Sequence, residues 1–138
     1  MDKLIEKIYG LRKGDLAWAK SQRDRYPLNE QMDGRGDAAA HMALGYITQR
    51  SKHPEEALRA ANLREYLTGI ATYSREMDIG NNKIGALIDA PDLESAQKQI
   101  DALIKGGKAK YYSPKESKKE SAKAYGLTSF YRSRGMLD

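Results

Sequence analysis

Apolar residues in this chain recur at helical spacing almost throughout, and few segments show the alternation of apolar and polar residues that marks a strand. The clearest helix begins at an alanine-rich stretch, residues 38–44, directly after Asp37. Alanine is the strongest helix former and aspartate is a preferred N-cap, so we predict a helix that Asp37 caps and that runs to about Arg50. The periodicity as a whole predicts a mainly α protein.

Turn and capping residues divide the rest of the chain into further helices. The predicted helices span about residues 4–11, 16–25, 38–50, 54–76, 77–90, 92–105 and 114–126. Asp15 and Asp92 stand where N-caps are expected, and Gly106-Gly107 is a typical helix end. Residues 108–112 are predicted to form a short extended piece. We therefore expect a single compact helical domain of about five or six helices, followed by a basic C-terminal arm.

Length and composition limit the function classes. The chain has 138 residues, enough for one domain with a single core, and it has no cysteine. The lack of cysteine excludes disulfides, cysteine nucleophiles and thiolate metal sites. No apolar run approaches the ~20 residues that span a membrane, and residues 1–6 lack the uncharged apolar region of a secretion signal. We therefore expect neither a membrane span nor secretion by that route.

Basic charge is concentrated near the C-terminal end. Residues 105–138 carry nine basic and three acidic side chains, a formal charge of +6, while the first 104 residues carry −1. We divide the chain into a helical domain, residues 1–112, and a basic arm with aromatic residues, residues 113–138. Such a mixture is typical of protein interfaces and also of nucleic-acid contacts, and we favour a protein partner. The predicted partner-binding residues are Lys110, Tyr111, Tyr112, Lys118, Lys119, Tyr125, Phe130, Tyr131, Arg132 and Arg134.

Polar residues interrupt three of the predicted apolar helices. They form a candidate polar network or metal site that consists of Asp37, His41, Glu65, Asp78, Asn81 and Asn82. Asp37 and His41 are four residues apart and therefore share one helix face. Such a set can form a buried network without any reaction, can hold a divalent ion through nitrogen and oxygen ligands, or can use His41 as a general base. We favour the network and assign no catalytic residue, with His41 and Glu65 as the candidates.

Two motifs in this set carry a resemblance to a known family. Residues 34–41 have the sequence Gly-Arg-Gly-Asp-Ala-Ala-Ala-His, and residues 77–85 have the sequence Met-Asp-Ile-Gly-Asn-Asn-Lys-Ile-Gly, with Glu65 between them. In this order they resemble an uncharacterised α-helical domain family that occurs in bacterial wall-associated proteins, in Rhs-type toxin proteins and in phage proteins. The resemblance covers residues 34–112, and the second motif is the more specific of the two.

The resemblance implies a function and two alternatives. Members of the family often have Arg where this chain has Ala40, and His where it has Gly80, so the loss of two polar side chains favours a non-enzymatic role. From the phage proteins we expect a small structural component of a virion, in the tail, near the portal or in the internal core, that contacts other virion proteins in a multi-copy assembly. The expected location is the virion or the host cytoplasm, and no cofactor is expected apart from the divalent metal that the polar set would admit. The alternatives are a nucleic-acid-binding accessory protein and a metal-dependent hydrolase or toxin-like enzyme that uses Asp37, His41, Glu65 and Asp78.

Overall fold

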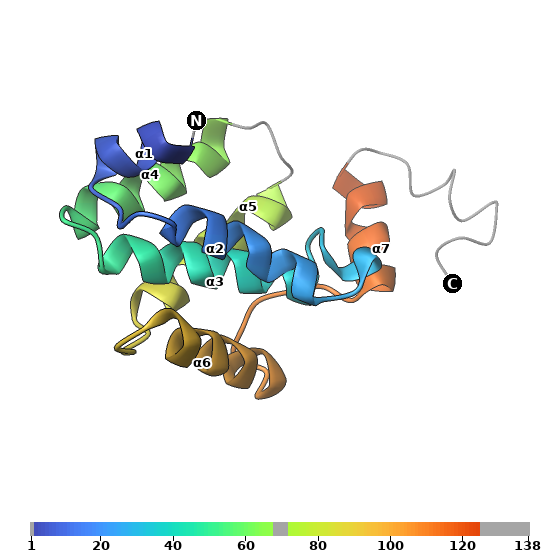
Figure 1. Ribbon diagram of the computed structural model, residues 1–138. Coiled ribbons are helices and arrows are strands. Elements are labelled where there is room, and N and C mark those ends of the chain that lie inside the picture. The colour runs from blue at the N-terminus through green and yellow to red at the C-terminus, as the bar shows by residue number, and fades with distance from the viewer. Residues whose placement is uncertain (1, 68–71, 125–138) are drawn as a thin grey trace.

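A computed structural model of the chain describes residues 2–67 and 72–124. These residues form seven α-helices, two short 3-10 helices and no strand, packed as one domain (Figure 1). The elements are α1 (Asp2–Tyr9), α2 (Asp15–Ser21), η1 (Gln22–Arg25), η2 (Leu28–Glu30), α3 (Arg35–Gln49), α4 (Pro54–Leu67), α5 (Thr72–Ala86), α6 (Leu93–Lys105) and α7 (Pro114–Ala124). The predicted mainly α fold is confirmed. Across the described ranges, every helix is too short or too polar to cross a bilayer.

Helix α3 is the centre of the fold, and most of its residues are buried. Helices α2, α4, α5 and α6 all pack against it (Figure 1). Its large side chains Met42, Tyr46 and Ile47 are fully buried in the space between these helices. Tyr46 also stacks edge to face on Trp18 of α2, and its hydroxyl donates a hydrogen bond to the carbonyl of Ala90 at 2.7 Å. The helix that begins at the alanine-rich stretch is therefore the one around which the domain is built.

Two glycines bring α3 and α5 into backbone contact. A Cβ atom added at Gly45 would lie 2.0 Å from the carbonyl oxygen of Asn82, and one added at Gly85 would lie 1.9 Å from that of Met42. Real Cβ atoms essentially never come within 3.0 Å of another heavy atom in this way, so a side chain at either position would push the helices apart. The crossing of α3 and α5 thus depends on two missing side chains, and Gly85 is the last residue of the second sequence motif.

The starts of two helices differ from those predicted. Helix α3 begins at Arg35, so Asp37 lies in its first turn rather than at the N-cap. The carboxylate of Asp37 still stabilises this turn, because it accepts a hydrogen bond from the backbone N–H of Asp33 at 3.1 Å. Helix α2 has Gly14 at its N-cap, in the left-handed conformation, and Asp15 is its first residue. Both carboxylates pair with an arginine from elsewhere in the chain, which local sequence does not reveal.

The single long helix predicted over residues 54–76 is wrong. The structure has two helices there, α4 and α5, which pack against each other and so cannot be one continuous rod. The residues between them, 68–71, lie outside the described part of the chain and include Gly69, whose low helix propensity is a sequence signal for a break. As a consequence, the helix predicted over residues 77–90 begins earlier, at Thr72.

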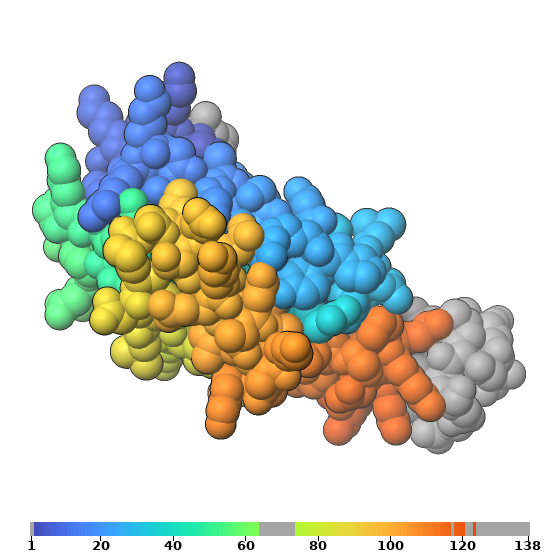
Figure 2. All heavy atoms as spheres, turned by 60° about the horizontal axis from the view of Figure 1, so that its bottom comes forward, coloured from blue at the N-terminus to red at the C-terminus, as the bar shows by residue number. Residues whose placement is uncertain are grey.

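The ends of α6 and the start of the arm follow the sequence signals. The carboxylate of Asp92 caps α6 by accepting a hydrogen bond from the N–H of Ser95 at 2.8 Å. Gly107, with a φ of 71°, follows the C-terminal end of α6 in the left-handed conformation. Residues 108–112 form neither helix nor strand. Helix α7 then lies at one end of the molecule, beside the segment that contains η1 and η2 (Figure 1, Figure 2).

Candidate functional site

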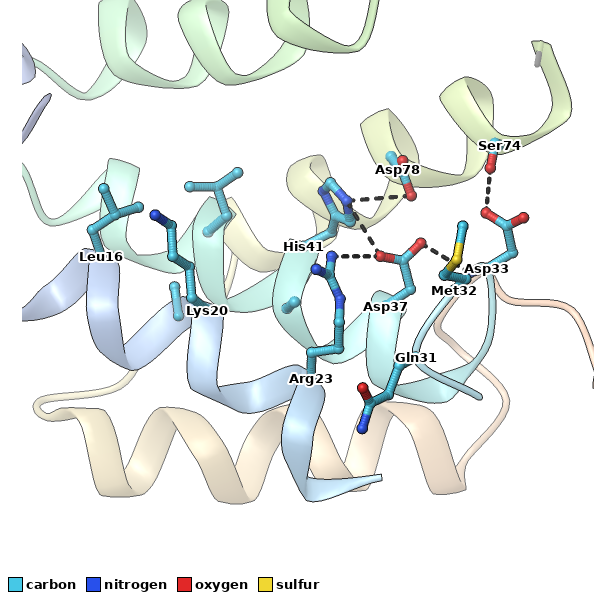
Figure 3. A pocket seen from close by; sticks show the side chains of 13 residues that line it. Leu16, Lys20, Arg23, Gln31, Met32, Asp33, Asp37, His41, Ser74 and Asp78 are labelled. Atoms are coloured by element: carbon cyan, nitrogen blue, oxygen red, sulfur yellow. Dashed lines mark hydrogen bonds and ion pairs between the residues drawn. The ribbon is translucent and has the colours of Figure 1, made fainter. Parts of the chain in front are cut away.

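Two carboxylates and one imidazole meet between α3 and α5. Asp37 and His41 lie one turn apart on α3, and Asp78 faces them from α5 (Figure 3). Nε2 of His41 is 3.4 Å from Oδ1 of Asp78 and 3.7 Å from Oδ1 of Asp37. The three side chains are only 11%, 7% and 9% exposed for His41, Asp78 and Asp37. We call these three residues the Asp–His–Asp centre.

The second nitrogen of His41 fixes the orientation of its ring. Nδ1 lies 2.9 Å from the side-chain amide of Asn82, a fully buried residue of α5. When the amide nitrogen faces His41, it donates to Nδ1 and also reaches the backbone carbonyls of His41 and Asp78 at 3.2 and 3.3 Å. The opposite orientation places the amide oxygen against those carbonyls. In this orientation of the amide Nδ1 accepts the hydrogen bond, so the ring N–H is at Nε2, which faces the two carboxylates. Asn62 of α4 lies 3.0 Å from the other end of the same amide.

Asp37 is held by partners outside the centre. Its Oδ1 accepts a hydrogen bond from the guanidinium of Arg23 at 2.8 Å, and its Oδ2 accepts one from the backbone N–H of Asp33 at 3.1 Å. The side chain of Asp33 accepts a hydrogen bond from the hydroxyl of Ser74 on α5. Arg23 extends from η1 toward Asp37 (Figure 3) and its side chain is 43% exposed. A partly exposed cation therefore contacts the centre.

The Asp–His–Asp centre forms part of the wall of a cavity of about 590 Å³. The remaining wall combines apolar side chains with a few polar ones: Leu16, Ala19, Lys20, Arg23, Gln31, Met32, Asp33, Ala40, Leu44 and Ser74. A volume of this size admits several water molecules or a small ligand. The buried carboxylates and imidazole thus have open space on one side and packed helices on the other.

The remaining residues of the predicted set lie elsewhere. Asn81 binds the chain at Lys110, because its Nδ2 donates to the carbonyl of Lys110 at 2.6 Å and its Oδ1 accepts from the N–H of Lys110 at 2.9 Å. Glu65 belongs to α4, but its side chain lies outside the described part.

Among the predicted partner-binding residues, Lys110, Tyr111, Lys118 and Lys119 are exposed and Tyr112 is half-buried. The others, Tyr125, Phe130, Tyr131, Arg132 and Arg134, lie outside the described residues.

Three residues that contact the Asp–His–Asp centre or its neighbour Asn82 were not predicted from the sequence. Asn62 had a signal, since it is an amide within an alanine-rich stretch of a helix, residues 57–63. Arg23 and Asp33 had none, because their positions depend on how residues 22–33 fold back against the start of α3.

A second buried ion pair lies at the other end of α3. Nε of Arg50 is 3.1 Å from Oδ2 of Asp15, whose side chain is 3% exposed. Burial raises the pKa of Asp15 above its usual value, and the positive charges of Arg50 and Arg12 oppose this rise. The buried carboxylate of Glu6 accepts a hydrogen bond from the N–H of Gly14 at 3.1 Å. These groups tie the turn between α1 and α2 to the end of α3, so their role is in the fold.

The Asp–His–Asp centre permits two kinds of chemistry. An imidazole at the wall of a cavity can exchange a proton with a bound group, and two carboxylate oxygens with an imidazole nitrogen are a ligand set for a divalent metal ion. No protein-family model, no curated protein and no solved structure matches this chain.

Proposed function

We propose that this protein is a small, non-enzymatic structural component of a phage virion that acts through contacts with other proteins of a multi-copy assembly. The resemblance of residues 34–41 and 77–85 to domains of phage proteins supports the virion assignment. An apolar surface on α1 and α4 supports the mode of action. This surface is the observation that carries the proposal.

Helices α1 and α4 border a largely apolar cavity of about 550 Å³. Its apolar lining residues include Ile5, Leu11, Leu16, Leu44, Ala57 and Leu63. On the bordering helices, Leu4 and Ile8 of α1 are each 59% exposed and Leu63 of α4 is 54% exposed. Clustered exposed apolar side chains mark interaction surfaces, whereas single ones occur on any protein. Leu4 and Ile8 are four residues apart and share one side of α1, and Leu63 lines the cavity that both helices border. We call these three exposed residues the α1–α4 face and propose that a neighbouring protein of the assembly covers it.

The contacts of the Asp–His–Asp centre also support a structural role. Both oxygens of Asp37 accept hydrogen bonds from other parts of the protein, Arg23 and the Asp33 backbone. Nδ1 of His41 is engaged by Asn82. Buried polar groups that are satisfied in this way fix one packing of helices without any reaction. Such a fixed packing of helices suits a domain that presents a constant surface to neighbouring proteins in an assembly.

Charge substitutions on the α1–α4 face test the proposal. We expect the full-length double variant Leu4→Glu/Ile8→Glu to keep the helical circular dichroism of the parent and to be lost from assembled virions. A carboxylate buried without a partner costs about 3 kcal/mol or more, over 100-fold in affinity. The control is Leu87→Glu, because Leu87 is 85% exposed and lies outside the α1–α4 face. Normal incorporation of the double variant would contradict the proposal.

A hydrolytic enzyme is the second candidate, because the Asp–His–Asp centre lines a cavity large enough for a small substrate. In that case His41 would need the tautomer with its proton on Nδ1, so that Nε2 can accept the proton of an attacking water. The test is hydrolysis of simple phosphoesters and carboxylic esters by the full chain and by the variant His41→Gln. Activity that this substitution abolishes in a folded protein would favour the enzyme over the structural component. Absence of activity, or activity that the substitution leaves unchanged, would remove the enzyme.

A further inference from the structure

The geometry points to a binding site for one divalent transition-metal ion at the Asp–His–Asp centre. The ligands are one oxygen each of Asp37 and Asp78 and Nε2 of His41, and such ligand atoms all lie within 4.8 Å of one another. An ion at this position links α3 to α5. The inference goes beyond the structural role proposed above and does not depend on it.

The two separations from Nε2 of His41 are close to those between ligand atoms around a single small ion. Two atoms that each lie about 2.1 Å from an ion are about 3.0 Å apart at a right angle and about 3.4 Å apart at a tetrahedral angle. Nε2 of His41 is 3.4 Å from Oδ1 of Asp78 and 3.7 Å from Oδ1 of Asp37. The separation to Asp78 already has the tetrahedral value, and the separation to Asp37 exceeds it by 0.3 Å. The adjoining cavity provides space for water molecules at the remaining coordination positions.

The types of ligand and their surroundings select the class of ion. Magnesium and calcium prefer sites made of oxygen atoms alone, whereas an imidazole with two carboxylates suits Mn²⁺, Fe²⁺ or Zn²⁺. A metal-binding imidazole needs its other nitrogen oriented by a hydrogen bond, and Asn82 lies 2.9 Å from Nδ1 of His41. When an ion takes Nε2, the imidazole proton moves to Nδ1 and the oxygen of the Asn82 amide accepts it. Ion binding at Nε2 therefore requires the Asn82 amide to turn its oxygen toward the ring, where that oxygen also faces the carbonyls of His41 and Asp78.

Arg23 competes with the ion for the carboxylate of Asp37. Its guanidinium donates at 2.8 Å to Oδ1 of Asp37, the oxygen that faces His41. In the absence of an ion this cation offsets one of the two buried negative charges. Because the Arg23 side chain is 43% exposed, it can move into solvent when an ion binds. The competition makes a specific prediction, namely that removal of Arg23 strengthens binding of the ion.

The experiment titrates the full chain, freed of metal with a chelator, with Mn²⁺ alone. The paramagnetic ion provides two measurements: the electron spin resonance signal of free Mn²⁺ gives the affinity, and broadening of imidazole proton resonances gives the location. We expect one ion per chain and selective broadening of His41, while His53, the other histidine, stays sharp. Asp78→Asn should weaken binding at least about 10-fold in a chain that remains helical. Thermal unfolding of the parent, and not of this variant, should shift upward with added Mn²⁺.

Two matched pairs of variants complete the test. His41→Gln should abolish binding and His53→Gln should leave it unchanged. Arg23→Gln should tighten binding about 5-fold, as expected when a half-exposed competing ion pair is lost. Its control is Arg35→Gln, because Arg35 is 41% exposed and pairs with Glu30 rather than with the centre. Absence of saturable binding by the folded parent up to about 1 mM Mn²⁺ would overturn the inference. Equal affinity of the parent and Asp78→Asn would also overturn it.

Discussion

The glycine contact between α3 and α5 allows the most quantitative prediction. In the variant Gly85→Ala, the new Cβ would lie 1.9 Å from the carbonyl oxygen of Met42 and 2.6 Å from its carbonyl carbon. Both of these atoms belong to the backbone of a central helix, so neither can rotate away. To reach the shortest separation that real Cβ atoms show, 3.0 Å, the helices must separate locally by about 1 Å.

This separation determines the expected loss of stability. Overpacking a well-packed core costs about 1–3 kcal/mol, and the rigid backbone on both sides places this site at or above the upper end. A gap of about 1 Å also removes a quarter to a half of the dispersion energy of the atoms along it. Alanine gains about 1 kcal/mol over glycine in a helix, which offsets part of the loss. We therefore expect Gly85→Ala to lower the free energy of unfolding by about 3 kcal/mol, a large share of the ~5–15 kcal/mol of a typical domain.

Gly80 on the same helix provides the control. A Cβ atom at Gly80 meets the side chain of Lys110, 2.7 Å from its Cδ, and that flexible side chain can move. Gly80→Ala should therefore be neutral or stabilising by up to ~1 kcal/mol. The measurement is urea unfolding of both variants and the parent, followed by far-ultraviolet circular dichroism. If Gly85→Ala were as stable as Gly80→Ala, the backbone contact would not be a real constraint and our account of the α3–α5 crossing would be refuted.

Two further predictions concern titratable groups. Burial, and a hydrogen bond to Asp101, raise the pKa of Tyr26 to about 12, so the folded chain keeps a proton that the unfolded chain loses from about pH 10. The free energy of unfolding should therefore fall as pH rises from about 10 to about 12. Urea unfolding of Tyr26→Phe should show a shallower fall across this range. An equal dependence on pH in the variant and the parent would argue against the raised pKa of Tyr26. Arg50→Met should cost about 3 kcal/mol near neutral pH, because it leaves Asp15 buried without its cation and raises the pKa of Asp15 further. The loss of stability should shrink as pH falls toward the pKa of Asp15, and it should also be smaller in the double variant Asp15→Asn/Arg50→Met. A loss that does not depend on pH and that Asp15→Asn does not reduce would contradict this.

The sequence predicted those parts of the fold that depend on neighbours along the chain. The helix at residues 38–50, the cap at Asp92 and the left-handed residue after α6 follow from propensity and capping chemistry, which act within a few residues. The shared face of Asp37 and His41 follows from their spacing of four residues. In contrast, the proximity of His41 to Asp78 came only from the order of the two motifs, because spacing does not show how two helices cross.

Features that depend on the crossing of helices could not be predicted from spacing. Gly45 and Gly85 are ordinary helix-weakening residues in the sequence, and their role is visible only where two backbones meet. Arg23 reaches Asp37 because η1 folds against α3, and Asn81 binds Lys110 because the chain after α6 returns to α5. The helix predicted through residues 54–76 failed for the same reason: local periodicity does not report a reversal that tertiary packing stabilises.

The amide of Asn81 has a mechanical consequence for the whole molecule. Asn81 lies one helical turn along α5 from Asp78, and its side chain forms two hydrogen bonds with the backbone of Lys110. Two residues later the N–H of Tyr112 donates at 2.7 Å to the carbonyl of Asp33, whose own N–H donates to Asp37. The segment that leads into α7, residues 108–113, is thus held by hydrogen bonds at Lys110 and Tyr112. The first contact is close to Asp78 and the second is close to Asp37. A force applied to α7 would therefore act first on these two sets of hydrogen bonds, which lie close to the Asp–His–Asp centre.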